Sequence, residues 1–378
     1  MSANLRRWLG VLVVPACAAV AHAGPPPYDQ WQTFGRSEGL PSDKVFCVLA
    51  TDSDVWAGTD DGLARYAAGA WTTYTPADGL AHRAVMALAQ DAQSGDVWIA
   101  TLGGLSRYSA GRFDTFNQLN SGLVNDVVYG VTVRHGEVWA ATAAGTSRYE
   151  IAPDRWRIYD QTNTPMHEIW CYSAAACGDK IYLGVWGGGL LEYDCARDRW
   201  KDYRDPDGEM EIDLFRNDGL VHDVVASVAC QEDQRVWIGT YFGLSSYDGR
   251  RWLNFSEDDS ALASNFINFV TMHGDDVWIA TDNGLNATDG RNWWSYRRRP
   301  GSDKGDITWS PAGGPEVRFV SETIFPHNYI LGISFQGDDI WVATDKGLAR
   351  GTHSNAAAAV AGALKVSKAL DNTERAVK

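Results

Sequence analysis

The chain has 378 residues, 17 of them tryptophan, and its formal net charge at pH 7 is −15. Such an acidic chain lacks the basic footprint that nucleic-acid phosphates require, which excludes nucleic acid as the main partner. The charge is compatible with a soluble body and with cationic partners, but it specifies none of them.

The first residues have the pattern of a secretory signal. Two arginines precede an apolar stretch at residues 8–14, and Ala-His-Ala at residues 21–23 offers small side chains where signal peptidase reads them. Pro15 interrupts this stretch, which is also too short to span a membrane, and we expect no membrane span later in the chain. We therefore expect residues 1–23 to be a cleaved signal peptide and the mature protein to be periplasmic or extracellular. Lipoprotein anchoring at Cys17 is the alternative.

One short phrase recurs seven times along the chain. Its first copy, residues 55–63, reads Val-Trp-Ala-Gly-Thr-Asp-Asp-Gly-Leu. The intervals between the aromatic residues of successive copies are 42, 41, 43, 55, 41 and 63 residues, counted over Trp56, Trp98, Trp139, Tyr182, Trp237, Trp278 and Trp341. A period of about forty residues with a tryptophan signature is typical of four-stranded sheets repeated around a ring. We therefore predict an all-β fold, a seven-bladed β-propeller of four-stranded antiparallel blades over residues 24–352.

The second repeat shows how each blade is built. Its apolar residues 83–90 predict an inner strand, and the signature tryptophan lies in a second strand at residues 96–101. A third strand at residues 105–108 and an alternating outer strand at residues 112–116 complete the blade, with glycine or aspartate at the turns. A small residue follows two positions after each signature aromatic, which indicates close packing between blades.

An aromatic residue also recurs in the outer strand of every repeat, at Trp31, Trp71, Phe113, Trp156, Trp200, Trp252 and Trp293. Trp31 precedes the first inner strand, whereas the seventh repeat ends at Gly351 without an outer strand. We therefore predict that residues 28–34 complete the last blade and close the ring, which removes free sheet edges. Residues 353–378 form an Ala-rich C-terminal tail, which we expect to be helical or disordered.

Five cysteines remain after the signal segment, namely Cys47, Cys171, Cys177, Cys195 and Cys230. An odd number leaves at least one thiol unpaired or intermolecular. An exported compartment permits disulfides, and the last three cysteines cluster around the fourth and fifth repeats. We expect one bridge among these three, and the pairing stays open.

The wording of the repeats resembles the two-component-regulator propeller repeat. Gly-Leu-x-x-Asp or Asn stands before the inner strands, and Val-Trp-Ile-Gly-Thr-x-x-Gly-Leu-x-x-Tyr follows, most clearly at residues 219–224 and 236–247. The resemblance covers about residues 28–350 and implies a seven-bladed propeller of the periplasmic sensor type. The sequence contains no transmembrane helix, kinase segment or immunoglobulin-like spacer, so we expect recognition outside the cytoplasm rather than signalling by this chain alone.

Function in such propellers is expected on the face where two sets of loops meet, those that lead into the inner strands and those between second and third strands. Both long intervals enlarge the first set, at residues 204–217 and 297–326. Long loops in compact domains are usually functional or disordered. We therefore expect both insertions on the loop-rich face, where Arg297, Arg298 and Arg299 would contact the acidic insertion or an anionic partner.

Four histidines share one position before the inner strands, which reads Ser42, His82, Asn125, His167, His222, Ser264 and His327. One interpretation is a ligand or metal site in the central funnel. The inner strands form a ring roughly 11 Å in radius if blades pack about 10 Å apart. A histidine with its zinc bond reaches only about 6–7 Å, so just His167 and His222, from adjacent blades, could share an ion. The other interpretation is that His, Ser and Asn satisfy backbone groups at this turn.

The loops between second and third strands differ around the ring. Blades four and five carry Trp186 and Tyr241-Phe242, whereas blades six, seven and one carry aspartates. Aromatic rings beside polar groups suit a sugar, a peptide or a protein partner. The alternative is that the rings pack under the insertion at residues 204–217. The predicted ligand-binding residues are His82, His167, His222, His327, Trp186, Tyr241 and Phe242.

The first insertion has an acidic residue at every second position, namely Asp205, Asp207, Glu209, Glu211 and Asp213. In an extended segment these side chains lie on one side, and oxygen-rich clusters can hold calcium. A solvated acidic loop is the alternative. No other cofactor is expected.

Three functions follow from these features. The first is an exported, non-enzymatic recognition module that binds a small ligand, a glycan or a protein partner on its loop-rich face. The second is a lyase or hydrolase that uses His167, Glu168, His222 and Asp223 for acid–base chemistry in the funnel. The third is a structural subunit of an envelope or extracellular assembly, in which the unpaired cysteine and the tail would be docking features.

Overall fold

The computed structural model describes residues 27–208, 215–231 and 235–354. The predicted signal peptide at residues 1–23, Cys17 and nearly all of the tail at residues 353–378 lie outside the described residues. So do Glu209, Glu211 and Asp213 of the acidic insertion. Within the described residues, no helix is long and apolar enough to cross a membrane.

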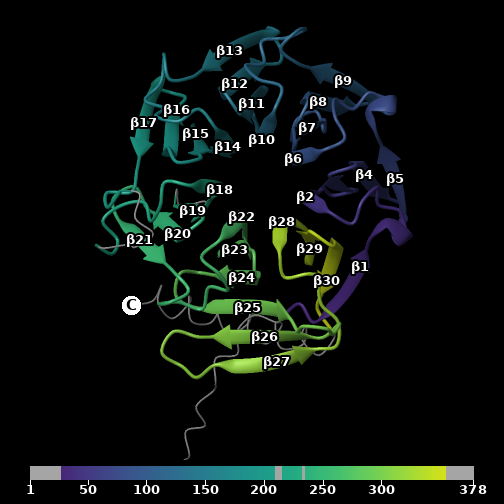
Figure 1. The fold of residues 1–378 in the computed structure, drawn as a ribbon, viewed down its shortest axis with the longest axis vertical. Coiled ribbons are helices and arrows are strands. Elements are labelled where there is room, and N and C mark those ends of the chain that lie inside the picture. The colour runs from purple at the N-terminus through teal and green to yellow at the C-terminus, as the bar shows by residue number, and fades with distance from the viewer. Residues whose placement is uncertain (1–26, 209–214, 232–234, 355–378) are drawn as a thin grey trace, which may run out of the picture.

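Seven antiparallel sheets stand around a central axis, as predicted (Figure 1). Six of them have the expected four strands, whereas the sheet of blade six has six. Blade one consists of β2 (Val45–Ala50), β3 (Val55–Thr59), β4 (Gly62–Ala67) and β5 (Ala70–Tyr74). Blade two consists of β6 (Val85–Gln90), β7 (Val97–Thr101), β8 (Gly104–Ser109) and β9 (Arg112–Phe116). Blade three consists of β10 (Val128–Arg134), β11 (Glu137–Thr142), β12 (Gly145–Glu150) and β13 (Arg155–Tyr159). Blades four and five consist of β14 (Cys171–Cys177), β15 (Lys180–Val185), β16 (Gly189–Asp194) and β17 (Arg199–Tyr203); and β18 (Val225–Cys230), β19 (Val236–Thr240), β20 (Gly243–Tyr247) and β21 (Trp252–Phe255). Blade six consists of β22 (Ile267–His273), β23 (Asp276–Thr281), β24 (Gly284–Thr288), β25 (Trp293–Arg298), β26 (Gly305–Ser310) and β27 (Val317–Ser321). Blade seven consists of β28 (Ile330–Gln336), β29 (Asp339–Thr344), β30 (Gly347–Thr352) and β1 (Gln30–Phe34).

The closure of the ring by the N-terminal strand is confirmed. β1 pairs antiparallel with β30, from Gln30 opposite Thr352 to Phe34 opposite Leu348. Tyr28, just before the strand, stacks on His353 and packs edge-on against Trp278. The two ends of the propeller are therefore held in one sheet and one core.

The expectation of a long functional loop at residues 297–326 is wrong. These residues include the hairpin β26–β27, which continues the sheet of blade six outward from β25 (Figure 1). The physical reason is an alternation typical of strands, in which Ile307 and Trp309 point into the hydrophobic core. The neighbouring arginines are used within blade six, where Arg298 pairs with Asp303 at 2.5 Å and Arg299 pairs with Asp306 at 2.6 Å.

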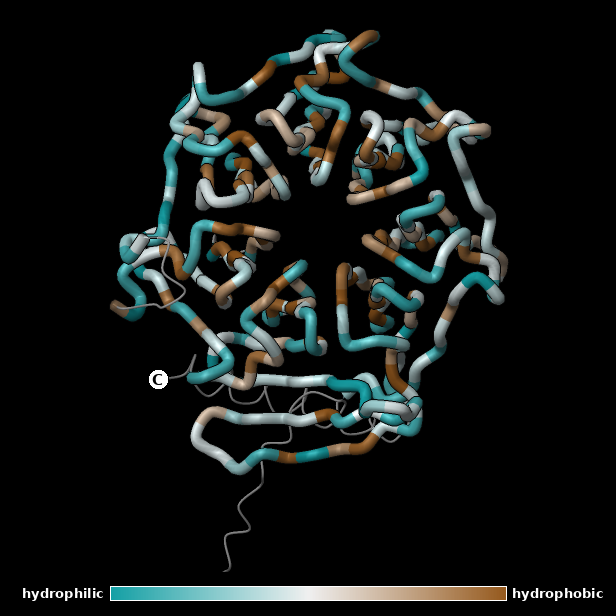
Figure 2. Tube along the Cα trace, in the orientation of Figure 1, coloured by the Kyte–Doolittle hydropathy of each residue, from teal (hydrophilic) through white to brown (hydrophobic). Residues whose placement is uncertain are grey.

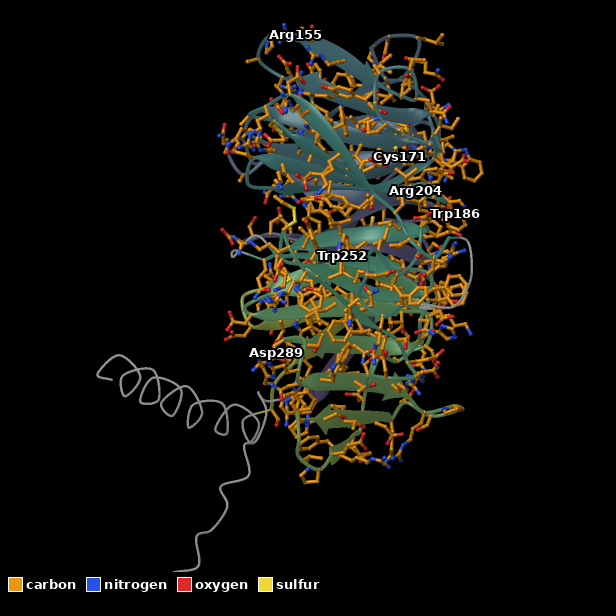
Figure 3. The ribbon with its side chains drawn as sticks, turned by 90° about the vertical axis from the view of Figure 1, so that its left-hand side faces the viewer. Arg155, Cys171, Trp186, Arg204, Trp252 and Asp289 are labelled. Atoms are coloured by element: carbon orange, nitrogen blue, oxygen red, sulfur yellow. A yellow bond between two sulfur atoms is a disulfide. The ribbon has the colours of Figure 1, made fainter. Side chains whose placement is uncertain are left out.

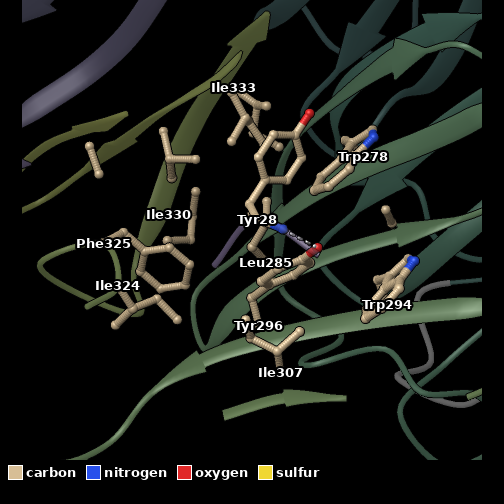
Figure 4. Packing of buried hydrophobic residues seen from close by; sticks show 14 of the residues in the cluster. Tyr28, Trp278, Leu285, Trp294, Tyr296, Ile307, Ile324, Phe325, Ile330 and Ile333 are labelled. Carbon is tan, nitrogen blue, oxygen red and sulfur yellow. Dashed lines mark hydrogen bonds between the residues drawn. The ribbon is translucent and has the colours of Figure 1, made fainter. Parts of the chain in front are cut away.

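Most of the repeated tryptophans lie in the core between blades, as expected. Trp98, Trp139, Trp237 and Trp341 are among the largest fully buried side chains. Hydrophobic residues concentrate inside the ring of blades, while the peripheral loops are mostly hydrophilic (Figure 2). The cluster between blades six and seven brings Tyr28 from the closing segment against Trp278 and Tyr296 (Figure 4).

Four blades share a pairing that the sequence analysis did not foresee. In each of them an arginine on the third strand lies opposite the signature tryptophan, over its ring, and pairs with an acidic residue beside the second strand. The sets are Arg65, Trp56 and Asp54; Arg107, Trp98 and Asp96; Arg148, Trp139 and Glu137; and Arg350, Trp341 and Asp339. In blade four the charges are exchanged between the strands. The cation, Lys180, is on the second strand, and it lies 2.6 Å from the carboxylate of Glu192 on the third strand.

One disulfide joins two neighbouring blades. Cys177 and Cys230, the last residues of β14 and β18, are bonded, which confirms one bridge among the three clustered cysteines. Cys47, Cys171 and Cys195 are free. Burial raises the pKa of Cys47 and of Cys171 to about 12, so these two thiols stay protonated at neutral pH.

Candidate functional site

The two sets of loops meet on one face of the disc, which we call the mouth. Trp186, in a loop of this face, and Asp289, in a turn of blade six, lie at opposite faces of the disc in side view (Figure 3). In every blade a turn residue after the second strand donates its backbone N–H to the carbonyl of a residue that leads into the inner strand. These bonds, 2.9–3.4 Å long, fix the two loop sets to each other.

The donors form a turn ring, consisting of Asp60, Leu102, Ala143, Trp186, Tyr241, Asp282 and Asp345. The acceptors form a loop ring, consisting of Lys44, Ala84, Val127, Trp170, Val224, Phe266 and Tyr329. The side chains of both rings differ around the mouth. Blades four and five contribute the aromatic residues Trp170, Trp186 and Tyr241, whereas blade one contributes a lysine and an aspartate. The mouth is therefore chemically asymmetric although the backbone repeats.

A third ring lies just below the mouth. Each inner strand has a β-bulge, and the residues at these bulges are Phe46, Met86, Tyr129, Tyr172, Ala226, Asn268 and Leu331. A bulge redirects a side chain, and bulges are common beside functional sites. All seven residues line a central cavity of about 610 Å³, together with Tyr241 and Tyr329 from the other two rings.

Aromatic rings follow one another along one side of the mouth. We call this set the aromatic crescent; it consists of Tyr129, Tyr172, Trp186, Tyr241, Phe242 and Phe266. Tyr129 stacks on Tyr172 at a centroid distance of 4.6 Å, Tyr172 contacts Trp186 at 5.0 Å, and Trp186 meets Tyr241 edge-on at 4.9 Å. Tyr241 continues to Phe266 at 5.4 Å. The crescent thus spans blades three to six in unbroken contact.

Aromatic residues of the loop ring reach solvent beside the crescent. Trp170, Phe266 and Tyr329 of the loop ring are 48%, 43% and 38% exposed. Burial, together with the neighbouring phenols of Tyr172 and Tyr329, raises the pKa of Tyr241 to about 12, so its hydroxyl stays a neutral hydrogen-bond donor. A partly exposed aromatic surface beside a cavity is typical of ligand sites.

The opposite end of the crescent leads to carboxylates. Asp282 and Asp345 occupy the turn ring in blades six and seven, and both of their turns are hydrogen-bonded to the backbone of residues 328–329. Burial, and then the charges of these two carboxylates, raise the pKa of Tyr329. The Oδ1 atom of each aspartate is buried and has no hydrogen-bond donor among the described residues, although Oδ1 of Asp345 lies 2.5 Å from Nδ1 of His327.

The shared histidine position works as a turn cap in most blades. The side chain accepts a hydrogen bond of 2.8–3.2 Å from the backbone N–H two residues later at Ser42, His82, Asn125, His222, Ser264 and His327. This matches the interpretation that these three residue types satisfy backbone groups. At His82 and His222 Nδ1 is the acceptor, so Nε2 carries the proton in the neutral ring. Nδ1 of His327 also lies 2.5 Å from Oδ1 of Asp345. No such cap forms at His167, whose Nε2 lies 3.7 Å from Asp202.

The predicted acid–base residues are tied into the loops. Asp223 accepts a 2.8 Å hydrogen bond from the backbone N–H of Asp205 and a 3.2 Å hydrogen bond from Arg204. His222 is nearly buried and its ring packs on Phe242 at 4.4 Å. The two residues thus face different partners, which favours a structural role for both.

In the described part of the acidic insertion, aspartate side chains accept hydrogen bonds from backbone N–H groups of the same insertion. Asp205 accepts a hydrogen bond from the N–H of Asp207, and Asp207 accepts one from the N–H of Phe215. Within the described residues, no group of three or more His, Cys, Asp or Glu side chains is arranged to hold a metal ion. The aromatic rings that contact Trp186 are those of Tyr172 and Tyr241.

Sequence reasoning found Trp186, Tyr241 and Phe242, and the structure places them together in the crescent. It missed the residues of the loop and bulge rings, above all Trp170, Tyr172, Phe266 and Tyr329. A signal was present, since the loop-ring residue lies two positions after the His or Ser position in every blade except blade four. Blade four has one extra residue there, which breaks the alignment.

No family model matches the chain, and no curated protein matches it. Among solved structures, the extracellular domain of the hybrid two component system BT3049 from B. thetaiotaomicron is similar, with a TM-score of 0.64 and 18% identity over 86% of this chain and 42% of that chain. The extracellular domain of BT4673 from the same organism gives 0.63 and 18%, over 85% of this chain and 40% of that chain. Virginiamycin B lyase from Staphylococcus aureus gives 0.59 and 13%, over 86% of this chain and 99% of that chain.

These similarities concern the fold. At 18% and 13% identity they show a shared propeller fold and no more. The chain spans less than half the length of the two extracellular domains. The residues at the mouth of this propeller are therefore the evidence for what it binds.

Proposed function

We propose that this protein is an exported, non-enzymatic recognition module that binds a small ring-containing ligand, such as a glycan, at the mouth of the propeller. The observation that supports it most directly is the aromatic crescent at the rim of the central cavity of about 610 Å³. Pockets that bind small molecules are mostly apolar, with a few well-placed polar groups, and this cavity has that composition. The phenols of Tyr241 and Tyr329 are the main polar groups at its upper edge.

The location outside the cytoplasm is part of the same proposal. It is supported by the signal-like pattern of residues 1–23 and by the disulfide between Cys177 and Cys230, because disulfides persist in oxidising compartments. The fold of extracellular sensor propellers is consistent with it.

The observations favour binding over catalysis. A general base needs a free basic atom directed at the substrate, but in His82, His222 and His327 the Nδ1 atom caps a turn. His167 has no such cap, but it is not among the residues that line the cavity. Stacking on aromatic rings needs no such group.

Ligand-observed NMR with a panel of mono- and disaccharides and short aromatic peptides tests the proposal. We expect at least one class of probe to bind, and the double variant Trp186→Ala/Tyr241→Ala to weaken that binding at least about tenfold, since two ring contacts are lost. The matched control is Leu102→Ala, which truncates the same turn-ring position on the other side of the mouth. Equal loss in the control, or none in the double variant, would overturn the proposal.

A further inference from the structure

Two carboxylates interrupt the apolar side of the mouth where the aromatic crescent ends. The backbone N–H of Asp282 donates to the carbonyl of Phe266, a member of the crescent, at 3.2 Å. The backbone N–H of Asp345 donates to the carbonyl of Tyr329 at 3.3 Å. Both aspartates thus extend from turns that are fixed against aromatic residues of the loop ring.

Tyr329 lies next to the turns of both carboxylates, because Asp345 donates to its carbonyl and Gly284, two residues after Asp282, donates to the carbonyl of Asn328 at 2.8 Å. The charges of Asp282 and Asp345 both act on its phenol, and the phenol in turn acts on that of Tyr241. Both tyrosines line the central cavity. A ligand seated on these two rings therefore lies within the field of both carboxylates.

The aspartate oxygens retain capacity for a partner. The Oδ1 atoms of Asp282 and Asp345 are both buried, but Oδ1 of Asp345 lies 2.5 Å from Nδ1 of His327, whereas Oδ1 of Asp282 has no hydrogen-bond donor among the described residues. Burial without a donor is costly for a carboxylate oxygen, and such groups usually have a functional reason. No ion pair of Asp282 occurs within the described part of the chain.

We propose that the ligand carries an organic cation, seated over Tyr241 and Tyr329 between Asp282 and Asp345. This rests on the proposed function and adds the chemical class of the ligand. An ammonium group is attracted by the faces of aromatic rings, most strongly where water is excluded, and by nearby carboxylates. The aromatic rings repel an anion for the same reason.

Basic groups lie on both sides of the mouth, and Arg297, on the side of Asp282, is exposed and donates to the backbone carbonyl of Ala263. Lys44 of the loop ring is over Phe46 of its own blade, 5.2 Å from the ring centroid. Arg83 pairs with Asp61 at 2.8 Å, in the turn of blade one. Lys346, beside Asp345, is exposed. The partly buried carboxylates therefore dominate the field over Tyr329, because exposed charges are screened by solvent.

A matched pair of probes isolates the charge. Choline and 3,3-dimethylbutan-1-ol have the same shape, but only choline is charged. By ligand-observed NMR on the full chain we expect choline to bind at least about tenfold more tightly than the neutral alcohol. We expect Asp282→Asn to weaken choline binding about tenfold. Asp60→Asn is the matched control, because Asp60 holds the same turn-ring position in blade one, and it should change the affinity less than about twofold.

The outcomes separate this proposal from the one on which it rests. If the alcohol binds as well as choline, and both depend on Tyr241, the mouth is a binding site but the cationic class is wrong. If neither binds, the cationic class is also overturned, and the saccharide and peptide panel decides the binding function by itself. An equal effect of Asp60→Asn and Asp282→Asn would contradict the placement of the cation between Asp282 and Asp345.

Discussion

The hydroxyl of Ser321 lies 2.8 Å from the backbone carbonyl of Asp29 and 2.5 Å from that of Thr323, so its one proton is shared between two acceptors. The contact with Asp29 joins the end of β27 to the segment that closes the ring. The backbone N–H of Trp31 adds a 3.0 Å bond to the hydroxyl of Thr323, and the Trp31 ring packs edge-on against Phe325. The extension of blade six therefore holds the closing strand from its outer side.

We predict that Ser321→Ala lowers the free energy of unfolding by about 1 kcal/mol, because a buried hydrogen bond to the closing segment is lost. Chemical denaturation measures this change. Ser310→Ala, on the same hairpin but with an exposed bond to Glu316, is the control and should shift stability by less than about 0.5 kcal/mol. Equal effects would show that the hairpin does not hold the closing strand.

The reversed charges of blade four give a second prediction. Glu192 accepts hydrogen bonds from Lys180, Tyr182 and Tyr203. Glu192→Arg should destabilise the protein, because it places a second cation beside Lys180. The double variant Lys180→Glu/Glu192→Arg restores the order seen with Glu137 and Arg148 in blade three. We expect a coupling energy of at least about 1 kcal/mol from a double-mutant cycle of unfolding free energies, and additive effects would refute the pairing.

His273 predicts how stability depends on pH. Burial, with a further effect of His353, lowers its pKa below the ordinary 6.5, although Asp338 opposes this shift. The unfolded chain then binds more protons than the folded one just below pH 6.5, so stability falls as the pH falls from 6.5 towards the lowered pKa. His273→Phe keeps a ring against Phe335 and should flatten this part of the melting-temperature profile. A profile with unchanged slope would contradict the assignment.

The disulfide gives a fourth prediction. Its residues are 53 positions apart, so its removal should cost about 2–4 kcal/mol of stability through the entropy of the unfolded chain. We expect the double variant Cys177→Ser/Cys230→Ser to melt at a clearly lower temperature than wild type. Cys195→Ser, at a free cysteine of blade four, should melt like wild type. A double variant as stable as this control would show that the bridge adds little to the closed ring.

The fold followed from the sequence because its repeated signals are local. The Trp phrase and the outer-strand aromatic sufficed for seven blades and for closure by Trp31 and its neighbours. The hairpin β26–β27 was missed because it carries no Trp phrase, and the length of the interval suggested a loop. Only its alternating Ile307 and Trp309 indicated a strand.

The site could be predicted less completely. Trp186 and Tyr241 were visible because they depart from a repeated turn, but their contact depends on how two blades pack. The roles of Tyr172 and Tyr329 depend on a β-bulge and on a cross-loop hydrogen bond, which no short pattern in one repeat encodes. The histidine position is the opposite case. Its residue type repeats between blades, but in the structure the repeated residue caps a turn.

Amide hydrogen exchange, with and without the tightest-binding probe of the saccharide, peptide and choline panel, tests the central claim most directly. That claim is that the ligand lies on the aromatic side of the mouth. It predicts protection in the loops at residues 169–172, 185–188, 240–243, 265–268 and 328–331. Protection confined to the opposite face around Asp289, or to the hairpin β26–β27, would contradict it.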